Sequence, residues 1–128
     1  MILFTLLSGS FLGCLAVILG AFGAHALKKT LTEEQLKSFE TSVKYQMYHA
    51  ILLLVIGFHF TLEATLEKLM VFCFVLGSIL FSFSIYGLVI SSSKNKKISI
   101  LGPITPLGGM LLILGWLLLS IAIYKLNF

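Results

Sequence analysis

The residues of this chain whose types and spacing could do chemistry are two histidines and the tyrosines beside one of them. His25 and His49 lie at the two ends of a polar connector that separates the first two apolar runs. Tyr45 precedes His49 by one helical turn, so both lie on one helix face, and Tyr48 is the direct neighbour of His49. If the two runs pack antiparallel, His25, Tyr45 and His49 converge in a polar site that could bind a proton, an anion or a lipid headgroup.

The same histidines have a plainer interpretation, because they lie at the edges of the predicted membrane spans. A polar side chain there anchors the chain at the interface or closes a helix end with a hydrogen bond. A haem or metal held by His25 and His49 would need further ligands, which the sequence around them lacks. His59 lies one helical turn before Glu63, and we expect it to pair with that carboxylate or to reach the interface. We therefore expect no metal and no cofactor.

A third candidate is the string Leu101-Gly-Pro-Ile-Thr-Pro-Leu-Gly-Gly109, which an ordinary helix interior would not contain. The simplest interpretation makes Thr105 an N-cap and Pro106 the first residue of a helix. The other interpretation is a break inside a span, which in transporters often marks a substrate site. Thr105 and Pro106 therefore join the candidate polar site, and the choice between a helix start and a functional break stays open.

The elements that must position these residues follow from the distribution of charge. All nine lysines and all five glutamates lie outside four long apolar runs, which are Ile2–Ala24, Tyr45–Leu62, Leu69–Ser93 and Ile98–Tyr124. A helix of about 20 apolar residues crosses the roughly 30 Å hydrocarbon core of a bilayer. With 128 residues, 59% of them hydrophobic, the sequence predicts one all-α domain over 1–128 that is a bundle of four transmembrane helices. The spans are expected at about 2–25, 46–65, 69–91 and 103–124.

The connector between the first two spans is predicted to contain an amphipathic helix over about 33–44, on the cytoplasmic side. Thr32 and Gln35 fit a capping box, in which each side chain bonds the backbone N–H of the other. Leu36 and Phe39 begin an apolar face at helical spacing. A helix of this kind lies on the membrane surface or covers the end of the bundle.

Packing between spans is predicted from two sets of residues. The first span carries a stripe of small residues that lets helix backbones approach closely in lipid, and the stripe faces either a neighbouring span or a second subunit. In the third span Ser82, Ser84 and Tyr86 are polar, and we expect them to form hydrogen bonds between helices. The stripe consists of Gly9, Gly13, Ala16, Gly20 and Gly23.

Lysine counts predict the orientation of the bundle. Seven lysines lie in the connectors after the first and third spans, and two lie on the opposite side. Because lysines collect in cytoplasmic loops, both connectors are expected in the cytoplasm, and both termini on the outer side of a cell membrane. The seven are Lys28, Lys29, Lys37, Lys44, Lys94, Lys96 and Lys97, and the two are Lys68 and Lys125.

Composition also narrows the function. The net charge is +4, but the lysines are scattered through the connectors rather than lined along one face, so no nucleic acid is expected as a partner. Cys14 and Cys73 form no CxxC pair, and no carboxylate cluster or Ser-His-Asp arrangement is present, so we expect no enzyme. The expected partners are membrane lipids and either further copies of the chain, as a homo-oligomer, or other membrane proteins.

Three strings taken together resemble a known family. They are Gly20-Ala-Phe-Gly-Ala-His25, then Tyr45-Gln-Met-Tyr-His49, then the string that ends at Gly109 with Gly115-Trp116 after it. In order and spacing the chain resembles the domain of unknown function 423, also called uncharacterised protein family 0382, to which transmembrane protein 256 of animals is similar. The resemblance implies a small multi-pass membrane protein without an established activity, and it supplies no catalytic residue.

Two functions are compatible with these expectations. The favoured one is a structural or accessory protein that interacts with other membrane components, because no apolar run contains an acidic residue. The alternative is a small transporter or channel. Since proton coupling through a small exporter needs a carboxylate in the membrane, such a transporter would have to use the polar site with His25, Tyr45 and His49 instead.

Overall fold

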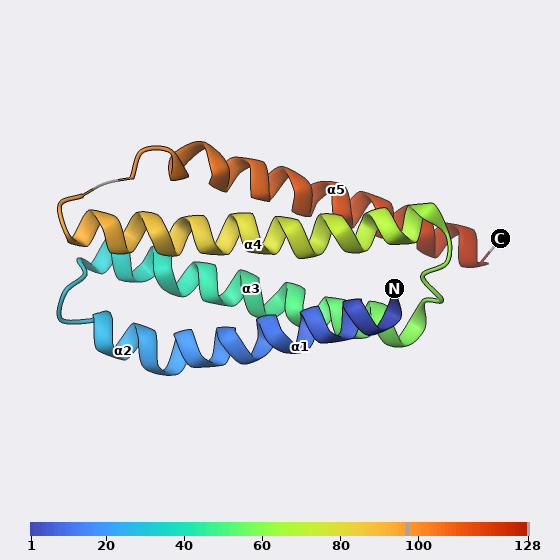
Figure 1. The fold of residues 1–128 in the computed structure, drawn as a ribbon, viewed down its shortest axis with the longest axis horizontal. Coiled ribbons are helices and arrows are strands. Elements are labelled where there is room, and N and C mark those ends of the chain that lie inside the picture. The colour runs from blue at the N-terminus through green and yellow to red at the C-terminus, as the bar shows by residue number, and fades with distance from the viewer. Residues whose placement is uncertain (97, 128) are drawn as a thin grey trace.

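The computed structural model describes residues 1–96 and 98–127, which form a bundle of long helices (Figure 1). No residue of these two ranges lies in a strand, and the all-α prediction is confirmed. α1, the π-helix η1 and the short α2 continue one another, and three long helices follow. The bounds are α1 Ile2–Ile18, η1 Leu19–Gly23, α2 Ala24–Leu27, α3 Glu33–His59, α4 Thr65–Ser93 and α5 Leu101–Asn127.

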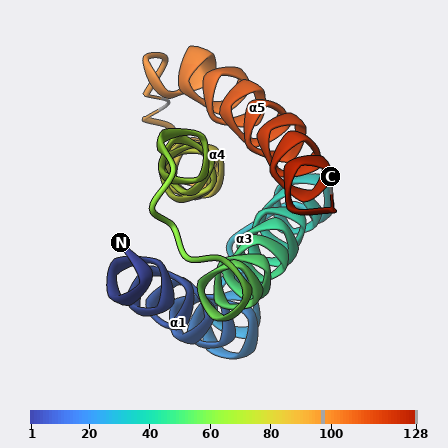
Figure 2. The ribbon, with the colours of Figure 1, turned by 90° about the vertical axis from the view of Figure 1, so that its right-hand side faces the viewer.

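The long helices pack as neighbours in chain order. α3 packs against α1 and against α4, and α5 packs against α4. Both termini and the α3–α4 connection lie at one end of the bundle, and α2 with the other two connections lies at the opposite end (Figure 1). Figure 2, which looks along the bundle from the end with the termini, shows α3 and α5 running at an angle to each other beside α4. This arrangement leaves α3 and α5 apart at the far end.

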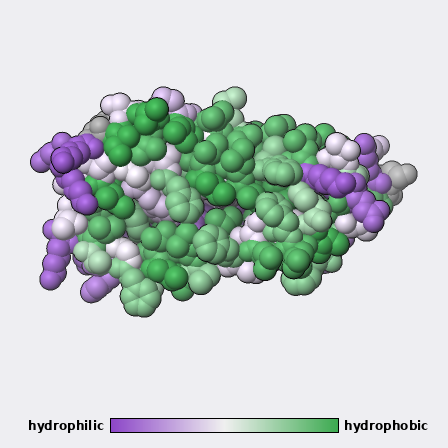
Figure 3. Space-filling view, viewed as in Figure 1, coloured by the Kyte–Doolittle hydropathy of each residue, from purple (hydrophilic) through white to green (hydrophobic). Residues whose placement is uncertain are grey.

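The surface divides along the bundle axis. On the face seen in Figure 3, apolar side chains form a broad band around the middle, and hydrophilic side chains gather at the two ends. Lys28, Lys29, Lys94 and Lys96 lie at the end that carries α2, which we call the lysine-rich end; Lys97 lies outside the described residues. Three stretches, formed by α1 to α2, by α4 and by α5, are long and apolar enough to cross a membrane. Such a band between two polar ends suits a protein whose middle faces lipid.

α3 is not among those three stretches. Its first half carries charged residues, and its second half contains Gln46, His49 and His59. The predicted amphipathic helix over 33–44 and the predicted second span over 46–65 are one continuous helix of 27 residues. It ends at His59, which corrects the predicted boundary at residue 65: Phe60 has an extended backbone and Leu62 a left-handed one, with φ 57°. Leu62 is 1% exposed. Packing of its buried side chain stabilises a turn that no glycine or proline indicates.

Local hydrogen bonds fix two of the helix ends. At the start of α3 the Gln35 N–H donates to Thr32 Oγ1 (3.2 Å) and the Thr32 N–H donates to Gln35 Oε1 (3.0 Å), so the predicted capping box is confirmed. At the end of α4, Asn95 is left-handed with φ 54°, a conformation that asparagine tolerates well. The Lys96 N–H then donates to the Ser91 carbonyl (3.0 Å), as in a Schellman motif.

α5 begins at Leu101 and contains Pro106 in its interior, so the prediction that Pro106 is the first helical residue is wrong. Pro103 lies in the first turn, where a backbone N–H has no helical partner, so its missing N–H costs no hydrogen bond. Pro106 removes only the bond that its N–H would give to the Gly102 carbonyl. The helix is therefore continuous through a string that suggested either a start or a break.

Small residues let the helices approach closely. A Cβ at Gly9 would lie 2.9 Å from the carbonyl oxygen of Ala50, so the backbone of α1 lies against α3. A Cβ at Gly108 would overlap the backbone of Phe81, so α5 lies directly on α4. In lipid, such packing rather than exclusion of water holds helices together. In the stripe of the first span, Gly9, Gly13, Gly20 and Gly23 all face α3, and Ala16 is 1% exposed.

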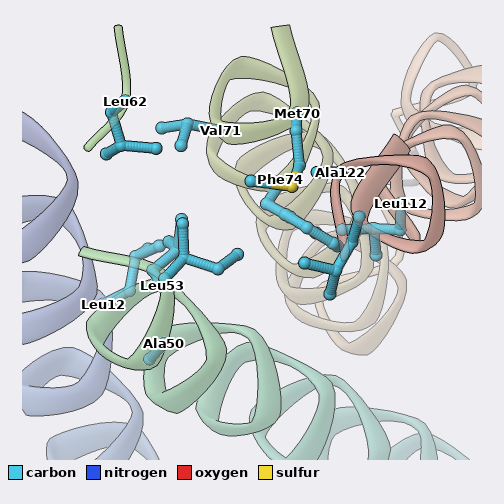
Figure 4. Close-up of a cluster of buried hydrophobic side chains, with 11 residues drawn as sticks. Leu12, Ala50, Leu53, Leu62, Met70, Val71, Phe74, Leu112 and Ala122 are labelled. Atoms are coloured by element: carbon cyan, nitrogen blue, oxygen red, sulfur yellow. The ribbon is translucent and has the colours of Figure 1, made fainter. Parts of the chain in front are cut away.

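Buried apolar side chains fill the bundle around these contacts (Figure 4). Leu12 from α1 and Leu53 from α3 lie together below Leu62 of the connecting turn, and Phe74 and Leu112 join α4 to α5. A second, smaller cluster lies toward the lysine-rich end and consists of Leu31, Phe39, Tyr86 and Val89. The polar residues described next lie beside these two clusters.

Candidate functional site

Tyr45, Tyr48 and His49 lie together on α3, and only His49 lies inside the bundle. The ring centroids of Tyr45 and His49 are 6.4 Å apart, and those of Tyr45 and Tyr48 are 6.1 Å apart. His49 is 5% exposed, whereas Tyr45 and Tyr48 are 44% and 59% exposed. The histidine is therefore held by the protein, and the two phenols face outward.

Both ring nitrogens of His49 have partners. Nδ1 lies 2.8 Å from the Tyr45 carbonyl oxygen, and Trp116 Nε1 lies 3.3 Å from Nε2. A carbonyl can only accept and an indole N–H can only donate, so Nδ1 carries the proton and Nε2 accepts from the indole. The rings of Phe74 and Trp116 pack against the imidazole, with centroids at 5.8 and 6.3 Å. This arrangement fits a neutral histidine that links α3 to α5.

The structure does not bring His25 to Tyr45 and His49. His25 is exposed and lies in α2 at the lysine-rich end. Gly23, two residues earlier, packs against Phe39 of α3. From Phe39 to His49 the distance along the helix is about 15 Å at 1.5 Å per residue. The small residues of the first span set its register on α3. This register places His25 more than two helical turns beyond Tyr45.

A glutamine that the sequence reasoning did not single out connects three helices. Gln46 is 0% exposed. Its Nε2 donates to the Leu12 carbonyl of α1 (2.9 Å), and its Oε1 accepts from the Tyr86 hydroxyl of α4 (2.9 Å). The Leu12 carbonyl can only accept, which fixes the orientation of the amide. A glutamine at the start of an apolar run, one turn after Ser42, is the signal that could have identified it.

Two serines add a reciprocal pair of bonds between α3 and α4. Ser42 Oγ donates to the Ser82 carbonyl (3.0 Å), and Ser82 Oγ donates to the Ser42 carbonyl (3.3 Å). The prediction that Ser82 and Tyr86 bond between helices is confirmed. Among buried side-chain oxygens and nitrogens of the described residues, only the Ser78 hydroxyl has no partner. Five buried polar residues thus join one helix to another, whereas Thr5 and Ser91 donate to carbonyls of the preceding turn. The five are Ser42, Gln46, His49, Ser82 and Ser84.

Thr105 and Pro106 lie in the first two turns of α5, nearer the lysine-rich end than His49. Thr105 Oγ1 and Ser84 Oγ are 2.6 Å apart, which joins α5 to α4 and confirms that Ser84 bonds between helices. Pro106 lines a groove and makes no part of the His49 cluster. The candidate polar site of the sequence is therefore divided among three places: α2, the α3–α5 contact at His49, and this groove.

The groove lies between α3 and α5, with α4 as its floor, at the lysine-rich end. It has a volume of about 600 Å³, within the range of about 300–1,000 Å³ of small-molecule sites. We call it the α3–α5 groove. Its lining residues are Lys37, Ser38 and Thr41 from α3, Ile85, Leu88 and Val89 from α4, and Gly102, Thr105 and Pro106 from α5.

Comparison with known proteins adds relatives of the whole chain. A family model described as protein of unknown function (DUF423) matches residues 19–109. A UPF0382 membrane protein of Staphylococcus aureus is 39% identical over 117 residues, which cover 91% of this chain and 92% of that protein. The UPF0382 membrane protein YwdK of Bacillus subtilis is 38% identical over 119 residues, covering 91% and 93%. One from Schizosaccharomyces pombe is 36% identical over 107 residues, covering 81% and 87%.

No solved structure matches the chain. The region that matches the family model begins at η1 and ends at Gly109, so it contains Gln46, His49 and Tyr86 as well as the lining of the α3–α5 groove. The buried bonds and the groove therefore belong to the part of the chain that the family model describes.

Proposed function

Because the chain belongs to the family of unknown function DUF423, whose relatives are named as membrane proteins, we propose that it is a four-span membrane protein without turnover of its own. It acts as a structural or accessory protein that interacts with other components of the cell membrane. Its partners are membrane lipids together with further copies of the chain or other membrane proteins.

One observation carries this proposal: the polar groups at membrane depth are used to join helices. Gln46 of α3 forms hydrogen bonds with α1 and with α4. Ser42 and Ser82 each donate a hydrogen bond to the other's backbone carbonyl. His49 has both nitrogens occupied by neighbouring groups. A proton carrier must release its partners during each cycle, whereas these contacts suit a scaffold of fixed shape.

The packing of α3 supports the fourth span. Residues 45–59 of α3 lie against the apolar α1 on one side and the apolar α4 on the other. A helix held between two membrane helices enters the bilayer with them. If α3 stayed outside the bilayer, it would lose close backbone contacts with α1, such as that of Gly9 with Ala50. With an even number of spans, the lysine-rich end lies in the cytoplasm and both termini lie outside.

Native mass spectrometry of the chain released from its own membrane tests the accessory role. We expect a defined complex with a fixed number of protein subunits, either copies of the chain or a second protein. A chain that leaves the membrane only as a monomer with lipid would contradict the proposal. Replacing His49 by Gln should lower the yield of the complex, because α5 loses a contact with α3 on which the shape of the bundle depends.

Flux measurements separate this role from transport. The full chain is reconstituted in vesicles with a pH-sensitive dye inside, and proton and potassium gradients are imposed. We expect the gradients to decay at the rate of vesicles without protein. A faster decay that returns to that rate in a folded His49→Gln variant would assign transport to the chain and overturn the accessory role.

A further inference from the structure

The α3–α5 groove differs in chemistry from a second groove, which lies between α1 and α4. The groove between α1 and α4 is almost wholly apolar, with Phe11, Val75 and Phe83 among its lining residues. The α3–α5 groove has an apolar floor, formed by Leu88 and Val89 among others, but its α3 wall carries an ammonium group and hydroxyl groups. A hydrocarbon chain fits the groove between α1 and α4, whereas the α3–α5 groove fits a molecule with an apolar part and a polar part.

The polar wall of the α3–α5 groove carries two opposite charges in a fixed order. Lys37 lines the groove itself. Glu34 lines its outward continuation, which shares Ser38, Leu88 and Val89 with the groove. Glu34 precedes Lys37 by three residues, so it lies on the same face of α3 and about 4.5 Å closer to the end of the bundle. The cation is thus the inner charge, and the carboxylate is the outer one.

Glu34 and Lys37 are both exposed, and the protein neutralises neither charge. Within residues 1–96 and 98–127, no side chain forms an ion pair or a hydrogen bond with the carboxylate of Glu34 or the ammonium of Lys37. Two unpaired charges beside an apolar floor favour a ligand that brings both counter-charges, since each charge-assisted hydrogen bond is about twice as strong as a neutral one.

The α5 wall adds open space. Gly102 lines the groove, and no atom lies within 4 Å of the position that its Cβ would take. The α5 wall therefore leaves room for a ligand beside Gly102.

We propose that the α3–α5 groove binds the headgroup of a phosphatidylethanolamine, with the phosphate at Lys37 and the ammonium at Glu34. The lipid has the same order of charges as the wall: its phosphate lies next to the glycerol and the chains, and its ammonium lies farther out. The chains lie on the apolar floor, and the ammonium N–H groups donate to the Glu34 carboxylate. This site goes beyond the proposed function, because it would serve an accessory protein and a transporter equally.

Two other phospholipid headgroups fit the groove less well. Phosphatidylcholine has the same charges, but its trimethylammonium has no N–H to donate to Glu34. Phosphatidylglycerol has the phosphate for Lys37 but no cation, so Glu34 stays unpaired beside an anion. The three lipids with identical chains therefore test the assignment of each charge.

Lipid retention measured by native mass spectrometry tests the proposal. The full chain in detergent is titrated with phosphatidylethanolamine, phosphatidylglycerol and phosphatidylcholine that carry identical chains. We expect phosphatidylethanolamine to bind about tenfold more tightly than phosphatidylcholine, the factor that one charge-assisted hydrogen bond provides. Equal binding of the three lipids, or tighter binding of phosphatidylglycerol, would overturn the assignment.

Variants locate the site. Glu34→Gln should remove the preference for phosphatidylethanolamine over phosphatidylcholine, and Lys37→Gln should weaken both by a similar factor. Glu33→Gln and Lys29→Gln make the same charge changes at exposed residues that do not line the groove, and they should leave binding unchanged.

Gly102→Leu should fill the groove and reduce binding of all three lipids. Full binding in the Glu34→Gln or Gly102→Leu variant would place the lipid elsewhere.

Discussion

At the scale of single residues, Gln46 shows what a buried amide contributes in a membrane bundle. Its two bonds reach α1 and α4, and its side chain is completely buried. In a bilayer each such bond contributes about 0.6 kcal/mol and at most about 1.7 kcal/mol, because the unfolded chain also finds partners. The amide therefore adds little stability, but its two bonds fix the position of α3 relative to α1 and α4.

Removing the amide should destabilise the bundle by a measurable amount. Gln46→Leu keeps the side-chain volume but leaves the Tyr86 hydroxyl buried without its acceptor, and we expect it to lower the free energy of unfolding by about 1–2 kcal/mol. Tyr86→Phe removes one hydrogen bond, and it should lower the free energy of unfolding by less than Gln46→Leu does. In a double-mutant cycle the two changes should be coupled by about 0.6 kcal/mol. Unfolding by SDS, followed by far-UV circular dichroism, measures each value, and strictly additive costs would contradict the bond.

Two serines of α4 and α3 provide a matched control. Ser42→Ala removes a bond to the Ser82 carbonyl and should lower stability by a few tenths of a kcal/mol up to about 1 kcal/mol. Ser78→Ala removes a buried hydroxyl that has no partner among the described residues, so stability should stay the same or rise. If both changes lowered the free energy of unfolding equally, the lost stability would reflect packing rather than hydrogen bonding.

His49 makes a prediction about protonation that needs no functional assay. The geometry requires the tautomer with the proton on Nδ1 and a bare Nε2 that accepts from Trp116. We therefore expect ¹⁵N NMR of the protein in micelles at neutral pH to show one protonated and one bare ring nitrogen for this residue. Trp116→Phe should shift the Nε2 resonance while leaving Nδ1 in place. Two protonated nitrogens in the wild-type chain would contradict the arrangement.

At the scale of whole elements, the closest helix contact is that of α5 on α4. Gly108 lies on the backbone of Phe81, Gly77 lies against the backbone of Leu112, and Gly115 lies against the Phe74 ring. In lipid the close approach of two backbones gains dispersion and is lost if one side chain intervenes. This contact explains Gly108, which belongs to the string that suggested a helix start or break.

Adding one methyl group at two glycines of α5 separates packing from helix propensity. Gly108→Ala should force α5 away from α4 and lower the free energy of unfolding by about 1–3 kcal/mol, as overpacking does. Gly102→Ala meets open space and should raise stability by about 0.5–1 kcal/mol through helix propensity. The SDS titration used for Gln46 compares the two variants, and equal effects would refute the close contact.

The sequence predicted what depends on local patterns. The capping box at Thr32, the apolar runs and the polar character of Ser82 and Tyr86 could all be recognised from spacing. The end of α3 at His59 could not, because it depends on Leu62 being buried by distant residues. The separation of His25 from His49 could not either, since it depends on the register of α1 along α3. Gln46 was identifiable from its type and place, but its partners lie on two other helices.

At the scale of the whole molecule, the length of α3 must be reconciled with the membrane. Its uncharged part, residues 45–59, is about 22 Å long at 1.5 Å per residue, which is shorter than the roughly 30 Å hydrocarbon core. α4 has 29 residues, or about 43 Å, and passes well beyond that core. If α3 crosses the membrane as proposed, the bilayer thins at α3 or Lys44 extends its ammonium to the interface, and both adjustments cost little.

Thiol labelling decides whether α3 crosses the membrane. In a background with Cys14→Ala and Cys73→Ala, cysteines are introduced separately as Lys29→Cys, before α3, and Lys68→Cys, after it. If α3 crosses with the lysine-rich end inside, a membrane-impermeant maleimide added to intact cells labels the cysteine at position 68. The cysteine at position 29 then reacts only after permeabilisation. If α3 lay on the surface, the two positions would share one side and react alike. Labelling of position 29 alone would keep the fourth span and reverse the orientation, which would contradict the assignment made from lysine counts.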